Sequence, residues 1–222
     1  MKKVLFVLSS HPERGETGVP TGFHLAEASH PWKVLHEAGF EVDFVSPKGG
    51  VAPIDAFDLN DEVNKEFWGN DKYQLKTKKT MEPSEVDASD YEAIHFVGGH
   101  GTMWDFPGNQ GLESIARKIY EDGGVVSAVC HGPAALVDLK LSDGSYLVDG
   151  KKVNSFTDAE EKEIKLEDVV PFLLESKLRE RGAKFENAGL WQEHVVVDER
   201  LVTGQNPASA KKVGEEVLKL IR

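Results

Sequence analysis

Residues 125–136 read VVSAVCHGPAAL, and this stretch decides the fold. Its first five residues form a short apolar run, which is typical of a buried strand. The run ends at Cys130, and the residues that follow begin a helical pattern. The small residues Ala128 and Gly132 lie two positions before and after the cysteine, as a sharp strand–turn–helix corner requires. We therefore predict that Cys130 occupies such a corner at the carboxyl end of a strand, where open α/β sheets bind their ligands.

Short apolar runs alternate with helical patterns over the rest of the chain. Strands that are apolar on both faces are typical of a parallel sheet covered on both sides, and this alternation favours right-handed βαβ crossovers. The chain is therefore predicted to be an α/β sandwich with a mostly parallel central sheet. Strands are expected at 4–8, 41–45, 93–97 and 125–129, two short strands around a polar turn at 194–203, and helices at 25–38, 112–121, 169–181 and 208–221.

The polar stretch 55–89 is predicted to be a surface excursion with one short helix at 60–68. The chain has no internal repeat, low-complexity tract or linker that would divide it. A length of 222 residues suits one large domain better than two. We therefore expect residues 1–222 to form a single domain.

Composition excludes several classes of protein. A hydrophobic share of 40% and a charged share of 29% are ordinary for a soluble globular protein, not for a disordered or membrane protein. The net charge of −12 repels phosphate backbones, so we expect no nucleic-acid partner. The apolar run at 4–8 is shorter than a secretory core requires, and no run approaches the length of a membrane span. We expect a cytoplasmic protein without membrane association.

The single cysteine excludes an internal disulfide and a multi-thiolate metal site. At the corner, the partial positive charge of the helix start would favour the Cys130 thiolate. The alternative is a buried structural cysteine that acts as a small core hydrophobe. His131 follows directly, but side chains of adjacent residues usually diverge, so adjacency alone does not make a catalytic pair.

Five segments carry a resemblance to a known family. They are AVCHGPA at 128–134, GGHGTMWD at 98–105, FTDAEE at 156–161, LVTGQNPASA at 201–210 and TGFHLAE at 21–27. Together they resemble the ThiJ/PfpI superfamily of class I glutamine amidotransferase-like proteins, and their combination resembles its chaperone/glyoxalase III branch. The resemblance implies a flavodoxin-like, three-layer α/β/α sandwich.

The resemblance implies the catalytic residues. Cys130 would be the nucleophile and His131 its acid/base partner. Glu161 would orient the histidine, although the adjacent Glu160 competes for this role. Glu27 would hydrogen-bond the thiol and shuttle protons. The alternative for these carboxylates is exposure on a helix, where the first turn favours negative charge.

The glycine-rich loop after the third strand resembles the loop that supplies an oxyanion-hole amide in this superfamily. Gly99 and the backbone of His131 are the expected donors. His100, Trp104 and His24 are expected to line the substrate pocket, with a plain core or surface role as the alternative. A small pocket capped by Trp104 would favour a three-carbon aldehyde.

Two other kinds of site are not expected. A dinucleotide fingerprint fails because Trp104 stands where its third glycine would be. His24 and Glu27 have a spacing that could share a metal, whereas His30 faces another side of the helix. Because no third ligand supports this pair, we expect no metal site.

The resemblance implies a glutathione-independent glyoxalase that converts methylglyoxal, a small 2-oxoaldehyde, to D-lactate without a cofactor. Cys130 would form a hemithioacetal with the aldehyde carbon. The resemblance also implies a homodimer. One alternative is a protein deglycase, an amidase or a peptidase that uses the same triad. Another is a stress holdase chaperone or an oxidation sensor, because an accessible Cys130 of low pKa would oxidise readily.

Overall fold

The computed structural model describes residues 2–222, and its main sheet has six strands in the order β3-β1-β5-β6-β10-β9. All neighbouring pairs are parallel except β10 with the edge strand β9. The predicted, mostly parallel sheet is confirmed. The strands are β1 (Lys3–Val7), β3 (Glu41–Val45), β5 (Tyr91–Phe96), β6 (Val125–Val129), β9 (Val195–Asp198) and β10 (Leu201–Gly204).

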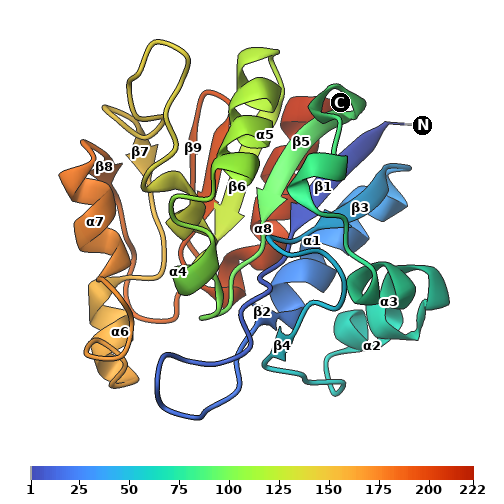
Figure 1. Cartoon of the computed structure of the whole chain (residues 1–222), viewed down its shortest axis with the longest axis horizontal. Helices are drawn as coiled ribbons and strands as arrows, with labels where there is room; N and C mark the ends of the chain where they lie inside the picture. Colours follow the sequence, from blue (N-terminus) through green and yellow to red (C-terminus); the bar gives the residue numbers. More distant parts are fainter. Residues whose placement is uncertain (1) are drawn as a thin grey trace.

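Helices cover both faces of this sheet and complete the predicted three-layer sandwich (Figure 1). Helices α1 (Leu25–Glu37) and α8 (Ala210–Ile221) pack together on one face, and α5 (Gln110–Glu121) covers the other. Each face has its own apolar core cluster, and the strands β6 and β10 are buried along their whole length. Burial on both sides explains why these strands read as continuous apolar runs rather than as alternating ones.

The stretch 55–89 contains more structure than predicted. Two helices form in it, α2 (Glu62–Gly69) and α3 (Asp71–Lys78), because Asn70 ends the first and caps the second by accepting hydrogen bonds from two backbone N–H groups. The rings of Phe67 and Tyr73 contact Trp32 of α1 at centroid distances of 5.1 and 5.0 Å. The segment is therefore part of the core, not only a surface excursion.

The helix predicted at 169–181 is also shorter than expected. It is present as α7 (Leu174–Glu180), and the residues before it form turns. Pro171 explains the difference, because proline disfavours a helical backbone at the preceding residue and lacks the N–H of a helix interior.

Short elements connect these helices and strands. They are β2 (Phe23–His24) paired with β4 (Ile54–Asp55), β7 (Lys152–Val153) paired with β8 (Lys184–Phe185), helices α4 (Thr102–Asp105) and α6 (Asp158–Glu163), and the 3₁₀ helices η1 (Pro83–Glu85), η2 (Ala88–Asp90), η3 (Gly132–Leu136) and η4 (Pro207–Ser209).

Among residues 2–222, no helix has the length and apolar character needed to span a membrane.

The Trp32 contacts give a test of the fold. Replacing Trp32 with alanine leaves a cavity between α1 and the α2–α3 pair, and we expect it to lower the free energy of unfolding by about 3–5 kcal/mol. Leu75 of α3 is 52% exposed, so Leu75→Ala should change this free energy by less than about 0.5 kcal/mol. Denaturant unfolding measures both, and equal effects of the two variants would contradict the placement of α2–α3 in the core.

Candidate active site

Cys130 lies at the end of β6 in the left-handed region of backbone space, with a φ of 59°. Its N–H donates to the carbonyl of Gly204 (2.9 Å), and its own carbonyl accepts from the N–H of Phe156 (2.8 Å). A Cβ at Gly132 would lie 2.2 Å from the Phe96 carbonyl oxygen, so only glycine fits there. The predicted corner is confirmed, although the helix after it is the five-residue 3₁₀ helix η3.

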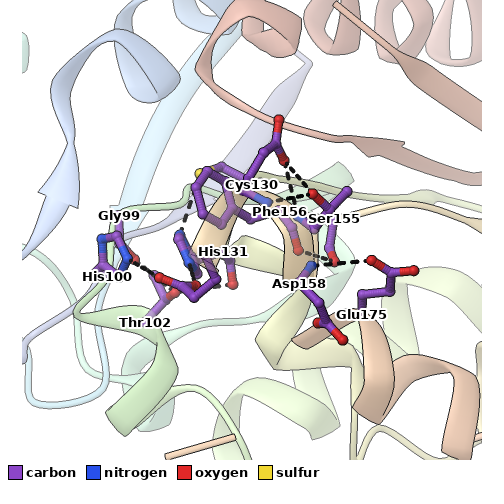
Figure 2. A network of polar contacts seen from close by, with 12 residues as sticks. Gly99, His100, Thr102, Cys130, His131, Ser155, Phe156, Asp158 and Glu175 are labelled. Carbon is purple, nitrogen blue, oxygen red and sulfur yellow. Dashed lines mark hydrogen bonds and ion pairs between the residues drawn. The ribbon is translucent and has the colours of Figure 1, made fainter. Parts of the chain in front are cut away.

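Cys130, His131 and Glu161 form a hydrogen-bonded row. The Cys130 Sγ lies 3.4 Å from His131 Nδ1 (Figure 2). His131 Nε2 lies 2.6 Å from a Glu161 carboxylate oxygen. The adjacent side chains converge because the turn at Cys130 redirects the chain between them. All three residues are buried. Of the two adjacent glutamates, Glu161 is therefore the one that contacts the histidine.

Glu160 has a separate role in the structure. Its buried carboxylate accepts a hydrogen bond from the Thr157 N–H, and the Thr157 hydroxyl oxygen accepts one from the Glu160 N–H, so the two residues make a capping box at the start of α6. The same carboxylate accepts from the N–H of Trp191 and from the side-chain amides of Gln205 and Asn206. Glu160 thus fixes the loop that carries Trp191.

Glu27 of α1 is fully buried, and its carboxyl lies so close to Gly98 that a Cβ there would be 2.2 Å from one oxygen. Burial raises the pKa of Glu27 to about 8, so this carboxyl is protonated at neutral pH. Burial and the neighbouring Glu27 also raise the pKa of the Cys130 thiol well above its ordinary value. The expectation that the helix start favours the thiolate is therefore wrong.

A second histidine binds the same carboxylate. His100 Nε2 lies 2.8 Å from the other oxygen of Glu161, and the rings of His100 and His131 are 4.1 Å apart. Burial opposes ionisation of Glu161, but the charge of His131 and the two hydrogen bonds hold its pKa at about 2. Burial, together with His131, lowers the pKa of His100 to about 4. One nitrogen or oxygen atom from each of His100, His131 and Glu161 lies within 4.8 Å of the others, which is close enough to bind one metal ion. Hydrogen bonds already join Glu161 to both histidines.

The expected oxyanion donors, Gly99 and His131, line the same cavity as Cys130. Gly99 has a φ of 106°, and a Cβ there would lie 2.3 Å from the Gly22 carbonyl oxygen. The Thr102 hydroxyl donates to the carbonyls of both Gly99 and His131, so the two loops are held at a fixed separation (Figure 2).

Cys130, His131 and Gly99 face a cavity of about 220 Å³. His24, His100 and Gly99 line it as predicted, but Trp104 does not. Trp104 instead stacks on His11, with ring centroids 5.3 Å apart, so it does not cap the pocket. The cavity is lined by Arg14, His24, Asp55, Gly99, His100, Cys130, His131, Phe156, Ile164, Trp191 and Pro207.

Sequence reasoning missed the aromatic wall of the cavity. Phe156 packs on His131 with centroids 4.3 Å apart, and Trp191 packs on Phe156 at 5.6 Å. Trp191 is 45% exposed and has a φ of 62°. No local pattern marks Trp191, because its position depends on contacts with Glu160 and Phe156, which are distant in sequence.

His24 lies at the mouth of the cavity next to Glu27. Its Nδ1 is 4.0 Å from a Glu27 oxygen, so the two side chains share a face as their spacing predicts. Burial lowers the pKa of His24 to about 4. His30 instead points to Asp61, at 2.9 Å.

We compared the chain with models of known protein families. The model of the DJ-1/PfpI family matches residues 18–220. The chain belongs to the DJ-1/PfpI family. Membership confirms the resemblance drawn from the cysteine corner and the four other segments.

Within the DJ-1/PfpI family, several relatives match over nearly their whole length. Glyoxalase 3 of Candida albicans is 35% identical, covering 98% of each chain. The glutathione-independent glyoxalase HSP31 of Saccharomyces cerevisiae is 38% identical over 94% of this chain and 93% of its own. The crystal structure of the Candida albicans glyoxalase III superposes with a TM-score of 0.92 at 34% identity, covering 100% of this chain and 98% of that one. The Rapid Encystment Protein 24 kDa of Francisella tularensis gives 0.96 at 39% identity, covering 100% of both chains.

The corner gives a stability test for this DJ-1/PfpI protein. Gly132→Ala would place a methyl group against the Phe96 carbonyl, so we expect the free energy of unfolding to fall by at least about 2 kcal/mol. At Gly69, no atom lies within 4 Å of the position that a Cβ would take, and Gly69→Ala should be close to neutral. Denaturant unfolding compares the two; a Gly132→Ala variant as stable as Gly69→Ala would contradict the tight corner.

The raised pKa of Glu27 predicts a pH dependence of stability. Between its ordinary pKa of 4.5 and about 8, the folded protein retains a proton that the unfolded chain releases, so the Glu27 contribution to stability falls as pH rises. Glu27→Gln removes this titration. We expect its free energy of unfolding, relative to wild type, to rise by roughly 4 kcal/mol between pH 4.5 and 8.5, because one pKa unit corresponds to about 1.4 kcal/mol.

The matched control for this prediction is Glu37→Gln on the same helix, since the Glu37 side chain is 63% exposed. Over the same pH range its effect should change far less than that of Glu27→Gln, because an exposed ion pair such as Lys33–Glu37 contributes little to stability. Denaturant unfolding at several pH values measures both variants, and a pH-independent effect of Glu27→Gln would show that Glu27 is ionised in the folded protein.

Proposed function

We propose that this protein is a cofactor-independent glyoxalase III that converts methylglyoxal to D-lactate through a Cys130 hemithioacetal. The observation that carries the proposal is the buried Cys130–His131–Glu161 row opening on a cavity of only about 220 Å³. Relatives named as glutathione-independent glyoxalases support the same reaction.

The first step is attack by sulfur. The Cys130 thiol adds to the aldehyde carbon while His131 Nδ1, 3.4 Å away, takes the thiol proton. The negative oxygen that forms is held by the N–H groups of Gly99 and His131, and it then takes the proton from His131. A neutral thiol suits this step, because the base removes its proton only as the carbon–sulfur bond forms.

The second step moves hydrogen from the aldehyde carbon to the ketone carbon. His131 takes the proton from the aldehyde carbon while the protonated carboxyl of Glu27 donates to the ketone oxygen, giving an enediol. His131 then returns its proton to the former ketone carbon, and Glu27 recovers one from the hydroxyl on the sulfur-bound carbon. The result is a lactoyl thioester on Cys130, with both catalytic groups restored.

Water completes the reaction. It attacks the thioester carbon, and the carbon–sulfur bond breaks to release lactate and the Cys130 thiol. Overall, one methylglyoxal and one water give lactate and a proton, so no oxidant, reductant or glutathione is consumed. The aldehyde carbon is oxidised and the ketone carbon is reduced within the same molecule.

The setting of this reaction belongs to the same proposal. We place the enzyme in the cytoplasm as a single-domain homodimer, without a nucleic-acid or membrane partner. A reducing compartment suits an enzyme that depends on one free thiol.

Removing the Cys130 thiol gives the most direct test of this mechanism. We expect Cys130→Ala to abolish lactate formation from methylglyoxal, whereas Leu75→Ala on α3 should keep the wild-type rate. The assay measures D-lactate with a stereospecific dehydrogenase, with no thiol added. Full turnover by Cys130→Ala, or a requirement of the wild type for glutathione, would rule the mechanism out.

A further inference from the structure

The His100 side chain is bound at one nitrogen and unbound at the other. Nε2 lies 2.8 Å from Glu161, and within residues 2–222 no group hydrogen-bonds to Nδ1. A carboxylate with a pKa of about 2 is ionised and only accepts, so the proton of the neutral imidazole must sit on Nε2. Nδ1 therefore carries a free lone pair.

This lone pair belongs to a side chain on the wall of the cavity that contains the sulfur. His100 and Cys130 both line that cavity, and Figure 2 shows the His100 ring beside His131. The His100 side chain is 12% exposed, whereas that of His131 is 1% exposed and has its Nδ1 against the sulfur. A water molecule that enters the cavity therefore reaches His100 more readily than His131.

One carboxylate serves both histidines. Glu161 carries a single negative charge, so it stabilises one imidazolium at a time. His100 therefore stays neutral while His131 holds the thiol proton, and it can accept a proton once His131 has given its own away. The arrangement suits two bases that act in succession.

We propose that His100 is the general base of the second half of the reaction, which activates the water that hydrolyses the lactoyl thioester. The proposal rests on the proposed glyoxalase function. His100 Nδ1 takes one proton from water as the oxygen bonds to the thioester carbon, and Glu161 stabilises the imidazolium. The carbon–sulfur bond then breaks, and the Cys130 thiolate takes its proton from the new carboxylic acid. His100 returns its proton to solvent, which leaves lactate, one free proton and the original enzyme.

The test compares His100→Gln with wild type. The glutamine amide nitrogen replaces Nε2 as donor to Glu161, but glutamine has no equivalent of the basic Nδ1. Trp104→Phe is the matched control, because Trp104 lies in the same segment outside the cavity. Rapid-mixing experiments follow the first turnover, and acid-quenched, desalted enzyme is treated with hydroxylamine, which releases a thioester as lactohydroxamate. All assays contain a chelator, and thermal unfolding confirms that each variant is folded.

We expect His100→Gln to form about one lactoyl thioester per Cys130 at nearly the wild-type rate and then to turn over about 100-fold or more slowly. Trp104→Phe should show neither effect. The proposal is overturned if His100→Gln keeps the wild-type steady-state rate. It is also overturned if His100→Gln slows formation of the first lactoyl thioester as much as it slows steady-state turnover and accumulates no thioester. The latter result would mean that His100 only positions Glu161. If wild type itself makes no lactate, the proposed function fails and this proposal with it.

Discussion

The left-handed backbone at Cys130 is the constraint on which the rest of the site depends. A residue other than glycine in this region costs about 1–2 kcal/mol, and hydrogen bonds to Gly204 and Phe156 hold it there. On a regular strand the side chains of Cys130 and His131 would point to opposite faces of the sheet. The turn brings them together instead, so two adjacent residues form a nucleophile and its base.

Three buried glutamates around this corner have three different electrostatic environments. Glu27 is fully buried and keeps its proton at neutral pH. Glu161 is paired with two imidazoles and stays ionised. Glu160 accepts hydrogen bonds from three parts of the chain and holds structure in place. One residue type thus supplies an acid, a charge partner and an anchor, because environment sets the protonation state.

Local patterns were sufficient to predict the central strands, the main helices and the cysteine corner, since each depends on residues close in sequence. Which of Glu160 and Glu161 meets the histidine depends on the rotation of α6, which no pattern specifies. Trp104 was wrongly expected to cap the pocket, and Trp191 was missed, because the position of a loop depends on distant contacts. The helix α7 was predicted to begin too early, because apolar periodicity was given more weight than Pro171.

The hydrogen bond from Cys130 to Gly204 has a consequence for the chain during its synthesis. Gly204 belongs to β10, the last strand of the sheet in sequence order, so every residue up to β10 must leave the ribosome before this strand can pair with β6. Until then the Cys130 backbone lacks one of the two hydrogen bonds that hold its left-handed conformation. The arrangement of Cys130 and His131 is therefore completed only after β10 has joined the sheet.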